Sequence, residues 1–176
     1  MTLRRVGFIT TLITLALLWP NSFLHAKNFF TVTSVYDGDT ISCQGYGIIF
    51  RVRLADIDAP EKGTKRRPEQ PYVDKARHYL KNLILGKTET IKQIGLDRYN
   101  HVLGIVRLDR KSGFFSSDRQ NINLEMVKKG YAEVLRGKQL FDIRPYRNAE
   151  KKAKAKKRNM WSQKDYVSPR EWRKKR

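Results

Sequence analysis

Short runs of apolar, aromatic and β-branched residues, separated by turn residues, open the main part of the chain. Residues 29–35, 41–43 and 48–54 have this composition, which is typical of β-strands. The turn Asp37-Gly38-Asp39-Thr40 separates the first two runs, and Gln44-Gly45-Tyr46-Gly47 separates the second from the third. The pattern predicts three consecutive antiparallel strands joined by tight turns.

A helical pattern follows, and then the strand pattern returns. Within residues 73–85 the apolar side chains recur at helical spacing, and Gly86 is a typical residue to end the helix. Residues 88–94 and 101–108 have the composition of strands, with a turn between them. These two segments bring the expected number of strands to five.

The last third of the chain predicts two more helices and one extended segment. A short helix begins after Asn121 or Asn123, either of which can cap it, and it stops at Gly130. Residues 131–135 are expected to be extended. Pro145 opens the last helix, which is expected to end near Met160 and Trp161.

This order of elements defines a fold class. Five short strands with one helix after the third strand and two helices near the end fit an α+β fold: a closed five-stranded Greek-key β-barrel of the OB type with three α-helices. OB barrels are used to bind oligonucleotides, but the fold alone does not prove that function.

The first 26 residues have the pattern of a secretory signal. Arg4 and Arg5 precede an apolar run over residues 6–19, and a segment that ends in Ala26 follows. The run is short for a membrane span, so we expect cleavage after Ala26 and a secreted or periplasmic protein, with an uncleaved membrane anchor as the alternative. The expected organisation is a signal peptide (1–26), one OB-fold domain (27–162) and a basic C-terminal tail (163–176), either solvated or in contact with a polyanion.

Charge narrows the choice of partners. The formal net charge is +20, and removal of the signal, with its two arginines and no acids, leaves +18. Such a chain is attracted to nucleic acid or to an anionic membrane surface, and composition does not choose between them. The lysine-rich last helix lacks an apolar face, so no stable membrane association is expected after cleavage. Cys43 is the single cysteine, which excludes an internal disulfide and a cysteine-rich zinc site.

One short part of this basic chain is rich in acidic residues. Five carboxylates, those of Asp37, Asp39, Asp56, Asp58 and Glu61, lie within 25 residues and flank a predicted hairpin that contains two arginines. Converging carboxylates repel one another unless a cation lies between them, and hard oxygen donors suit Ca²⁺ or Mg²⁺. The alternative is two surface turns with ordinary solvated acids. The basic loop over residues 62–71 is likewise either a contact for a phosphate backbone or a solvated loop.

Several short motifs together resemble the staphylococcal nuclease (thermonuclease) family over residues 29–161. In chain order they are Asp37-Gly38-Asp39-Thr40, Arg53-Leu54, Asp58-Ala59-Pro60-Glu61, Asp97-Arg98-Tyr99 and Asn159-Met160-Trp161. The resemblance implies a Ca²⁺-dependent nuclease that hydrolyses phosphodiester bonds of DNA, RNA or both and leaves 3′-phosphates.

The resemblance also assigns roles to particular residues. It implies that Asp39 and Asp58 are carboxylate ligands of one Ca²⁺ ion, with the carbonyl of Ala59 as a third protein oxygen. Arg53 would bind the scissile phosphate, and Glu61 would activate the attacking water. The ion and Arg53 would then neutralise the charge that grows on the phosphate oxygens.

The chain departs from the family pattern at His101, where the family has its second catalytic arginine, and at Asn100, where it has glycine. Histidine is mostly neutral at pH 7 and cannot make a forked contact, so His101 either weakens catalysis or acts as a general acid that protonates the leaving oxygen. The two outcomes lead to two functions: an active nuclease, or an OB-fold nucleic-acid-binding protein with weakened catalysis. A monomer is expected in both.

Two further assignments concern nucleic-acid contacts and one extra acid. At Arg136 and Lys138 the best-known relative has tyrosines that stack on a nucleotide, so stacking would come from Tyr99 beside Arg98, or basic contacts from Arg136 and Lys138 would replace it. Asp56 either supports the metal site or bonds to a neighbouring backbone group.

Overall fold

The computed structural model describes residues 29–109, 119–137 and 139–174 of the chain. Its strands and helices are β1 (Phe29–Val35), β2 (Thr40–Gly45), β3 (Ile48–Leu54), β4 (Ile57–Asp58), α2 (Val73–Ile84), β5 (Thr88–Leu96), β6 (Val102–Asp109), β7 (Arg119–Asn121), α3 (Ile122–Lys129), β8 (Glu133–Val134), α4 (Arg144–Ala155), the 3₁₀ helix η1 (Asn159–Ser162) and α5 (Pro169–Trp172). The predicted signal segment lies outside the described residues.

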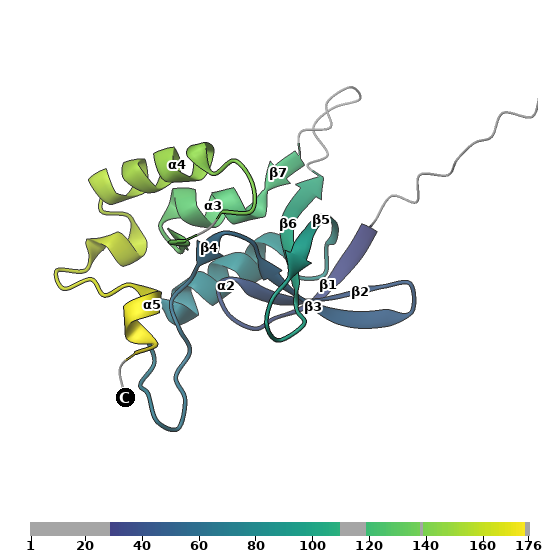
Figure 1. Ribbon diagram of the computed structural model, residues 1–176, viewed down its shortest axis with the longest axis horizontal. Helices are drawn as coiled ribbons and strands as arrows, with labels where there is room; N and C mark the ends of the chain where they lie inside the picture. The colour runs from purple at the N-terminus through teal and green to yellow at the C-terminus, as the bar shows by residue number, and fades with distance from the viewer. Residues whose placement is uncertain (1–28, 110–118, 138, 175–176) are drawn as a thin grey trace, which may run out of the picture.

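The five expected strands form a mixed β-barrel, which confirms the predicted fold class (Figure 1). β1, β2 and β3 form an antiparallel meander, β5 pairs with β1, and β6 pairs with β5. A parallel pairing of β3 with β6 then closes the barrel, with Arg53 opposite Leu103. The short strand β7 extends the sheet beyond β6, and β4 pairs separately with β8.

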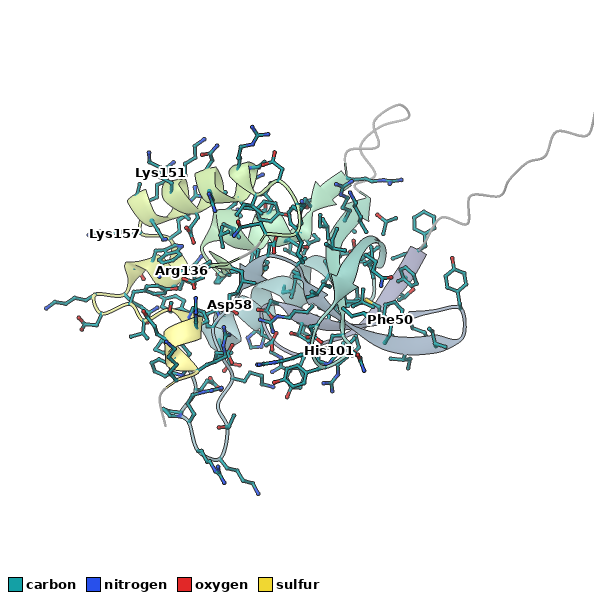
Figure 2. The ribbon with its side chains drawn as sticks, viewed as in Figure 1. Phe50, Asp58, His101, Arg136, Lys151 and Lys157 are labelled. Carbon is teal, nitrogen blue, oxygen red and sulfur yellow. The ribbon has the colours of Figure 1, made fainter. Side chains whose placement is uncertain are left out.

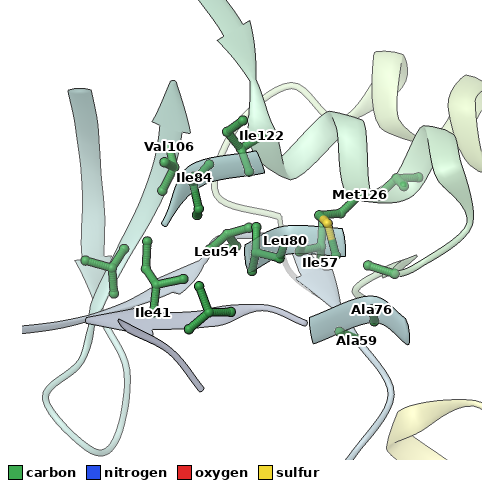
Figure 3. Close-up of a cluster of buried hydrophobic side chains, with 14 of the residues drawn as sticks. Ile41, Leu54, Ile57, Ala59, Ala76, Leu80, Ile84, Val106, Ile122 and Met126 are labelled. Carbon is green, nitrogen blue, oxygen red and sulfur yellow. The ribbon is translucent and has the colours of Figure 1, made fainter. Parts of the chain in front are cut away.

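The hydrophobic core fills the space between the barrel and the first two helices (Figure 3). Inward side chains of the barrel, such as Ile41 and Leu54, meet Leu80 of α2 and Met126 of α3, and all four are at most 1% exposed. Full burial of such side chains is worth about 1.5–3 kcal/mol each. The core therefore fixes the two helices against the same barrel that carries the acidic turns.

A buried asparagine joins α3 to the barrel next to the closing strand pair. The side chain of Asn123 accepts a hydrogen bond from the backbone N–H of Val106 at 3.1 Å and donates to the carbonyls of Ala55 and Gly104 at 3.1 and 3.0 Å. Asn123 therefore adds three hydrogen bonds to backbone groups beside the β3–β6 pairing. The N-cap of α3 is Asn121, the other predicted candidate, and the helix ends at Gly130 as expected.

The chain beyond α4 contains more regular structure than the sequence predicts. The predicted end of the last helix near Trp161 is wrong, because α4 stops at Ala155 and a separate 3₁₀ turn begins at Asn159. Lys157 and Asn159 have positive φ angles of 47° and 45°, which interrupt the helix between the two. The short helix α5 then packs beside the loop between β4 and α2 (Figure 1). No helix within the described ranges combines the length and the apolar character that a bilayer crossing needs.

The first acidic turn is closely packed at Gly38. A Cβ atom at this position would lie 2.7 Å from the Cβ of Ala59 and 2.9 Å from that of Ala76. Gly38→Ala is therefore expected to lower the free energy of unfolding by about 1–3 kcal/mol, measured by urea denaturation. Gly95→Ala is the matched control, because a Cβ there meets no atom within 4 Å. Equal stability of the two variants would contradict the packing.

Candidate active site

The first acidic turn holds Asp39 in a fixed orientation. Asp39 is 3% exposed, and the hydroxyl of Thr40 donates to its Oδ1 at 2.9 Å. The backbone N–H of Ala59 donates to its Oδ2 at 3.0 Å, which ties the first turn to the segment that follows β4. The carboxylate of Asp37 in turn accepts the backbone N–H of Asp39 at 3.0 Å.

Arg53 joins the two acidic segments. It lies on β3, and its Nη2 atom is 3.2 Å from Oδ2 of Asp39 and 3.0 Å from Oδ1 of Asp58. Asp58, on β4, is fully buried. The expected convergence of Asp39, Asp58 and Arg53 is thus present in the fold, and these acids are not solvated surface groups.

The electrostatics of this cluster follow from burial and from the close charges. Asp39 is the main cause that raises the pKa of Arg53 above its ordinary value, so the guanidinium stays charged. Burial raises the pKa of Asp58, while the neighbouring Arg173 and Arg53 oppose that shift. Burial also raises the pKa of Asp37, to about 7, and the charge of Asp39 adds to the effect.

Glu61 lies at the start of the loop between β4 and α2, next to the cluster. Its Oε2 is 3.4 Å from Nη2 of Arg67, and its Oε1 accepts a hydrogen bond from Nη1 of Arg173. Burial raises the pKa of Glu61 above its ordinary value, although the neighbouring Arg173 opposes this shift. Arg67 belongs to the loop that we expected either to be solvated or to contact phosphate, and here it contacts a carboxylate of the site.

Arg173 is the residue of this cluster that sequence analysis missed. Its guanidinium makes a forked pair with Asp58, with Nη1 to Oδ1 at 2.9 Å and Nη2 to Oδ2 at 2.7 Å. The pair with Asp58 raises the pKa of Arg173 above its ordinary value. The sequence signal was the capping box of Ser168 and Glu171, which starts α5 and places Arg173 at its end.

His101 lies at the start of β6, where the strand pairs with β3. Val102, the next residue, is opposite Val52, which places His101 alongside the strand that carries Arg53. Its Nδ1 is 3.0 Å from Oδ2 of Asp97, so Nε2 is the ring nitrogen that does not contact this carboxylate. Burial raises the pKa of Asp97, but hydrogen bonds from the backbone N–H groups of His101 and Tyr99 outweigh it and lower the pKa.

The predicted nucleic-acid contacts lie in two places. Arg98 and Tyr99 are exposed on the turn between β5 and β6, where the guanidinium carbon of Arg98 is 4.9 Å from the centre of the Tyr99 ring. Arg136 is exposed just after β8, the strand that pairs with β4. Asp58 lies between Arg136 and His101 in Figure 2. Lys138 lies outside the described residues.

Asp56 bonds to backbone groups, which is the second of the two roles expected from the sequence. It adopts a positive φ of 55°, and its Oδ2 accepts the backbone N–H of Leu140 at 2.9 Å. Its carbonyl accepts the backbone N–H of Leu135 at 2.9 Å. Asp56 therefore bonds to backbone groups and fixes the segment that contains Arg136.

The oxygen atoms of this site fit a hard divalent cation. Oδ2 of Asp39 and Oδ1 of Asp58 both reach the same nitrogen of Arg53, so the two carboxylates point toward one place. Anionic oxygens in this arrangement suit Ca²⁺ or Mg²⁺. Within the described residues no three or more histidine, cysteine or acidic side chains form a metal cluster, so further ligands would come from backbone, water or substrate.

The fold and the site together are an OB-type barrel with a buried carboxylate pair and an arginine that contacts both acids. Residues 51–163 match the family model described as staphylococcal nuclease homologue, and the chain belongs to that family. The match confirms the resemblance drawn from the motifs.

Several curated proteins are similar to this chain. An "Uncharacterized endonuclease" of Haemophilus influenzae is 35% identical over 148 residues, which cover 84% of this chain and 74% of that protein. A protein of the same description from Escherichia coli is 35% identical over 155 residues, 88% of this chain and 90% of that protein. "Probable endonuclease LCL3" of Vanderwaltozyma polyspora is 39% identical over 128 residues, but the match spans only 44% of its length.

The pKa of Asp37 predicts a pH-dependent stability. Because folding raises this pKa from 3.8 to about 7, the folded state binds the proton more tightly, and stability falls as pH rises through that window. Asp37→Asn keeps an acceptor for the N–H of Asp39 and removes the titration. In chelator, the stability of the wild type relative to the variant should decline from about pH 4 to about pH 7 and then level off. Urea denaturation at each pH measures this difference, and a constant difference would contradict the assignment.

Proposed function

We propose that this protein is a metal-dependent endonuclease that hydrolyses phosphodiester bonds of DNA, RNA or both, with Ca²⁺ as its ion. The observation that carries the proposal is the convergence of Asp39 and Asp58 on Arg53, with Glu61 beside them. Membership of the nuclease family and the endonuclease descriptions of the relatives support the same activity.

The chain's own residues account for most of the chemistry. Arg53 presents a charged guanidinium from a rigid strand, where it can bind two oxygens of the scissile phosphate. Glu61 can hold and orient the attacking water through a carboxylate that is already fixed at both oxygens. Asp39, Asp58 and the carbonyl of Ala59 would hold the Ca²⁺ ion, which supplies positive charge to the phosphate oxygens when it is bound. His101, held by Asp97, can protonate the leaving oxygen through Nε2.

Substrate binding is proposed to extend beyond the reacting phosphate. Tyr99 can stack on a base, and Arg98 and Arg136 can contact the backbone on the two sides of Asp58. The chain's net charge of +20 supports attraction to nucleic acid of either type. We also propose export with removal of residues 1–26, which rests on the sequence pattern of that segment.

A cleavage assay tests the activity. The chain from Lys27 onward should solubilise nucleic acid in Ca²⁺ and should lose this activity in chelator, and analysis of the product ends should find 3′-phosphates. Arg53→Ala and Glu61→Gln should each lower the rate on the order of 10²–10³-fold. Arg107→Ala is the control, because Arg107 is an exposed arginine of β6 that pairs with β7, away from the acids. Binding without any cleavage between mildly acidic and alkaline pH would refute the proposal.

A second candidate function is nucleic-acid binding with weakened catalysis. It is favoured by the histidine at position 101, which cannot make the forked contact of an arginine, and an arginine in such a role can be worth about 10³-fold or more in rate. His101→Arg separates the two. If the wild type is inactive and this variant cleaves nucleic acid, the protein is a binding protein. If the wild type is active with an acid-shifted pH optimum and the variant loses that shift, His101 acts as a general acid.

A further inference from the structure

The end of the chain docks beside the site as a defined C-terminal arm, residues 164–174. The arm is held to the loop between β4 and α2, residues 59–72, by three hydrogen bonds from different side chains. The indole N–H of Trp172 donates to the carbonyl of Pro68 at 3.1 Å, Nε2 of Gln70 to that of Val167 at 2.8 Å, and Nη1 of Arg67 to that of Arg173 at 3.4 Å. Figure 1 shows α5 beside this loop.

The arm is also attached to the barrel side of the site. The hydroxyl of Tyr166 donates to Oε2 of Glu133 at 2.8 Å, and Glu133 is the strand partner of Asp58. Two residues further along the arm, the Ser168–Glu171 capping box fixes the first turn of α5. These contacts, together with that of Trp172, fix the direction of the backbone that leads to Arg173.

The loop that the arm contacts is the loop that carries Glu61. Gln70, which is 3% exposed, accepts the backbone N–H of Glu61 through Oε1 at 3.0 Å and donates to Val167 of the arm through Nε2. Most other residues between Glu61 and Gln70 are exposed. In this part of the described chain, one β-bridge joins Thr64 to Arg67. Little apolar packing therefore holds this loop, and its position depends on these polar contacts.

The side chain of Glu61 depends on the arm in the same way. Arg173 bonds to its Oε1 and Arg67 to its Oε2, and Arg67 is itself bonded to the backbone of Arg173. The same guanidinium of Arg173 makes the forked pair with Asp58, so one group sets the position of Glu61 relative to Asp58. Arg173 is 33% exposed and thus lies at the edge of the site, with one face toward solvent.

We propose that the C-terminal arm is part of the nuclease site and that Arg173 is a positioning residue that holds Glu61 in place beside Asp58. This inference rests on the proposed function, because Glu61 needs to be placed accurately only if it orients the attacking water. Misplacement of a catalytic group by about 1 Å can cost 10²-fold in rate. The arm thereby brings a further guanidinium to a site that has histidine at position 101.

Kinetics of three variants test the role. Arg173→Ala should lower kcat about 10–100-fold and change KM less than about threefold, because the contact orients Glu61 and does not hold the substrate. Arg173→Lys should lie between this variant and the wild type, since one ammonium can reach Glu61 but cannot fork onto Asp58. Added methylguanidinium should restore part of the activity of Arg173→Ala. Arg170→Ala, an exposed arginine of the same helix, is the control and should behave as wild type.

Hydrogen exchange supplies a readout that does not need the ion or the substrate. In chelator, the amides of residues 61–70 should exchange faster in Arg173→Ala than in the wild type and Arg170→Ala, while those of the barrel strands stay unchanged. Should Arg173→Ala fail to fold, Arg173→Lys carries both measurements with smaller expected changes.

Failure of the proposed function and failure of this inference give different results. A wild-type chain that does not cleave overturns the proposed function, and this inference falls with it. An active wild type with Arg173→Ala equal to it in kcat and in loop exchange overturns the inference alone. An Arg173→Ala variant with higher kcat than the wild type also overturns it, because the arm would then cover the site and restrain it.

Discussion

Charge compensation in a buried place is the constraint on which the site depends. Asp39 and Asp58 are 3% and 0% exposed, and two ionised carboxylates so close together are unfavourable without positive charge between them. Arg53 supplies that charge from the barrel, and Arg173 supplies more from the far end of the chain. The proposed ion would serve the same need. The fold thus keeps two buried carboxylates close to two guanidinium groups.

The topology of the barrel fixes the arginine that compensates the acids. Arg53 lies on β3 where that strand makes the parallel pairing with β6, so strands on both sides hold the residue in place. The neighbouring Asn123 forms hydrogen bonds to backbone groups beside this junction and attaches α3 to it. The acids, in contrast, lie on turns and short strands at the edge of the barrel. A rigid arginine and locally shaped acidic segments together give a site that needs little reorganisation.

Much of this arrangement was predictable from local patterns. The five strands follow from β-branched runs bounded by Gly and Asp turns, and the convergence of Asp39 with Asp58 follows from the hairpin between them. The break in the last helix was not predictable, because lysine and alanine favour continuation and the positive φ of Lys157 depends on tertiary contacts. Arg173 was missed for a related reason. A basic tail is usually solvated, and only its long-range pairing with Asp58 gives it a role.

The contact between Arg173 and Asp58 joins residues that are 115 positions apart in the chain. During synthesis from the N-terminus, the barrel and its acids are made before Arg173. Closing so long a loop also costs entropy, which the contacts of the arm have to offset. A protease cut just before the arm would accordingly leave a complete barrel whose carboxylates have lost one of their cationic neighbours.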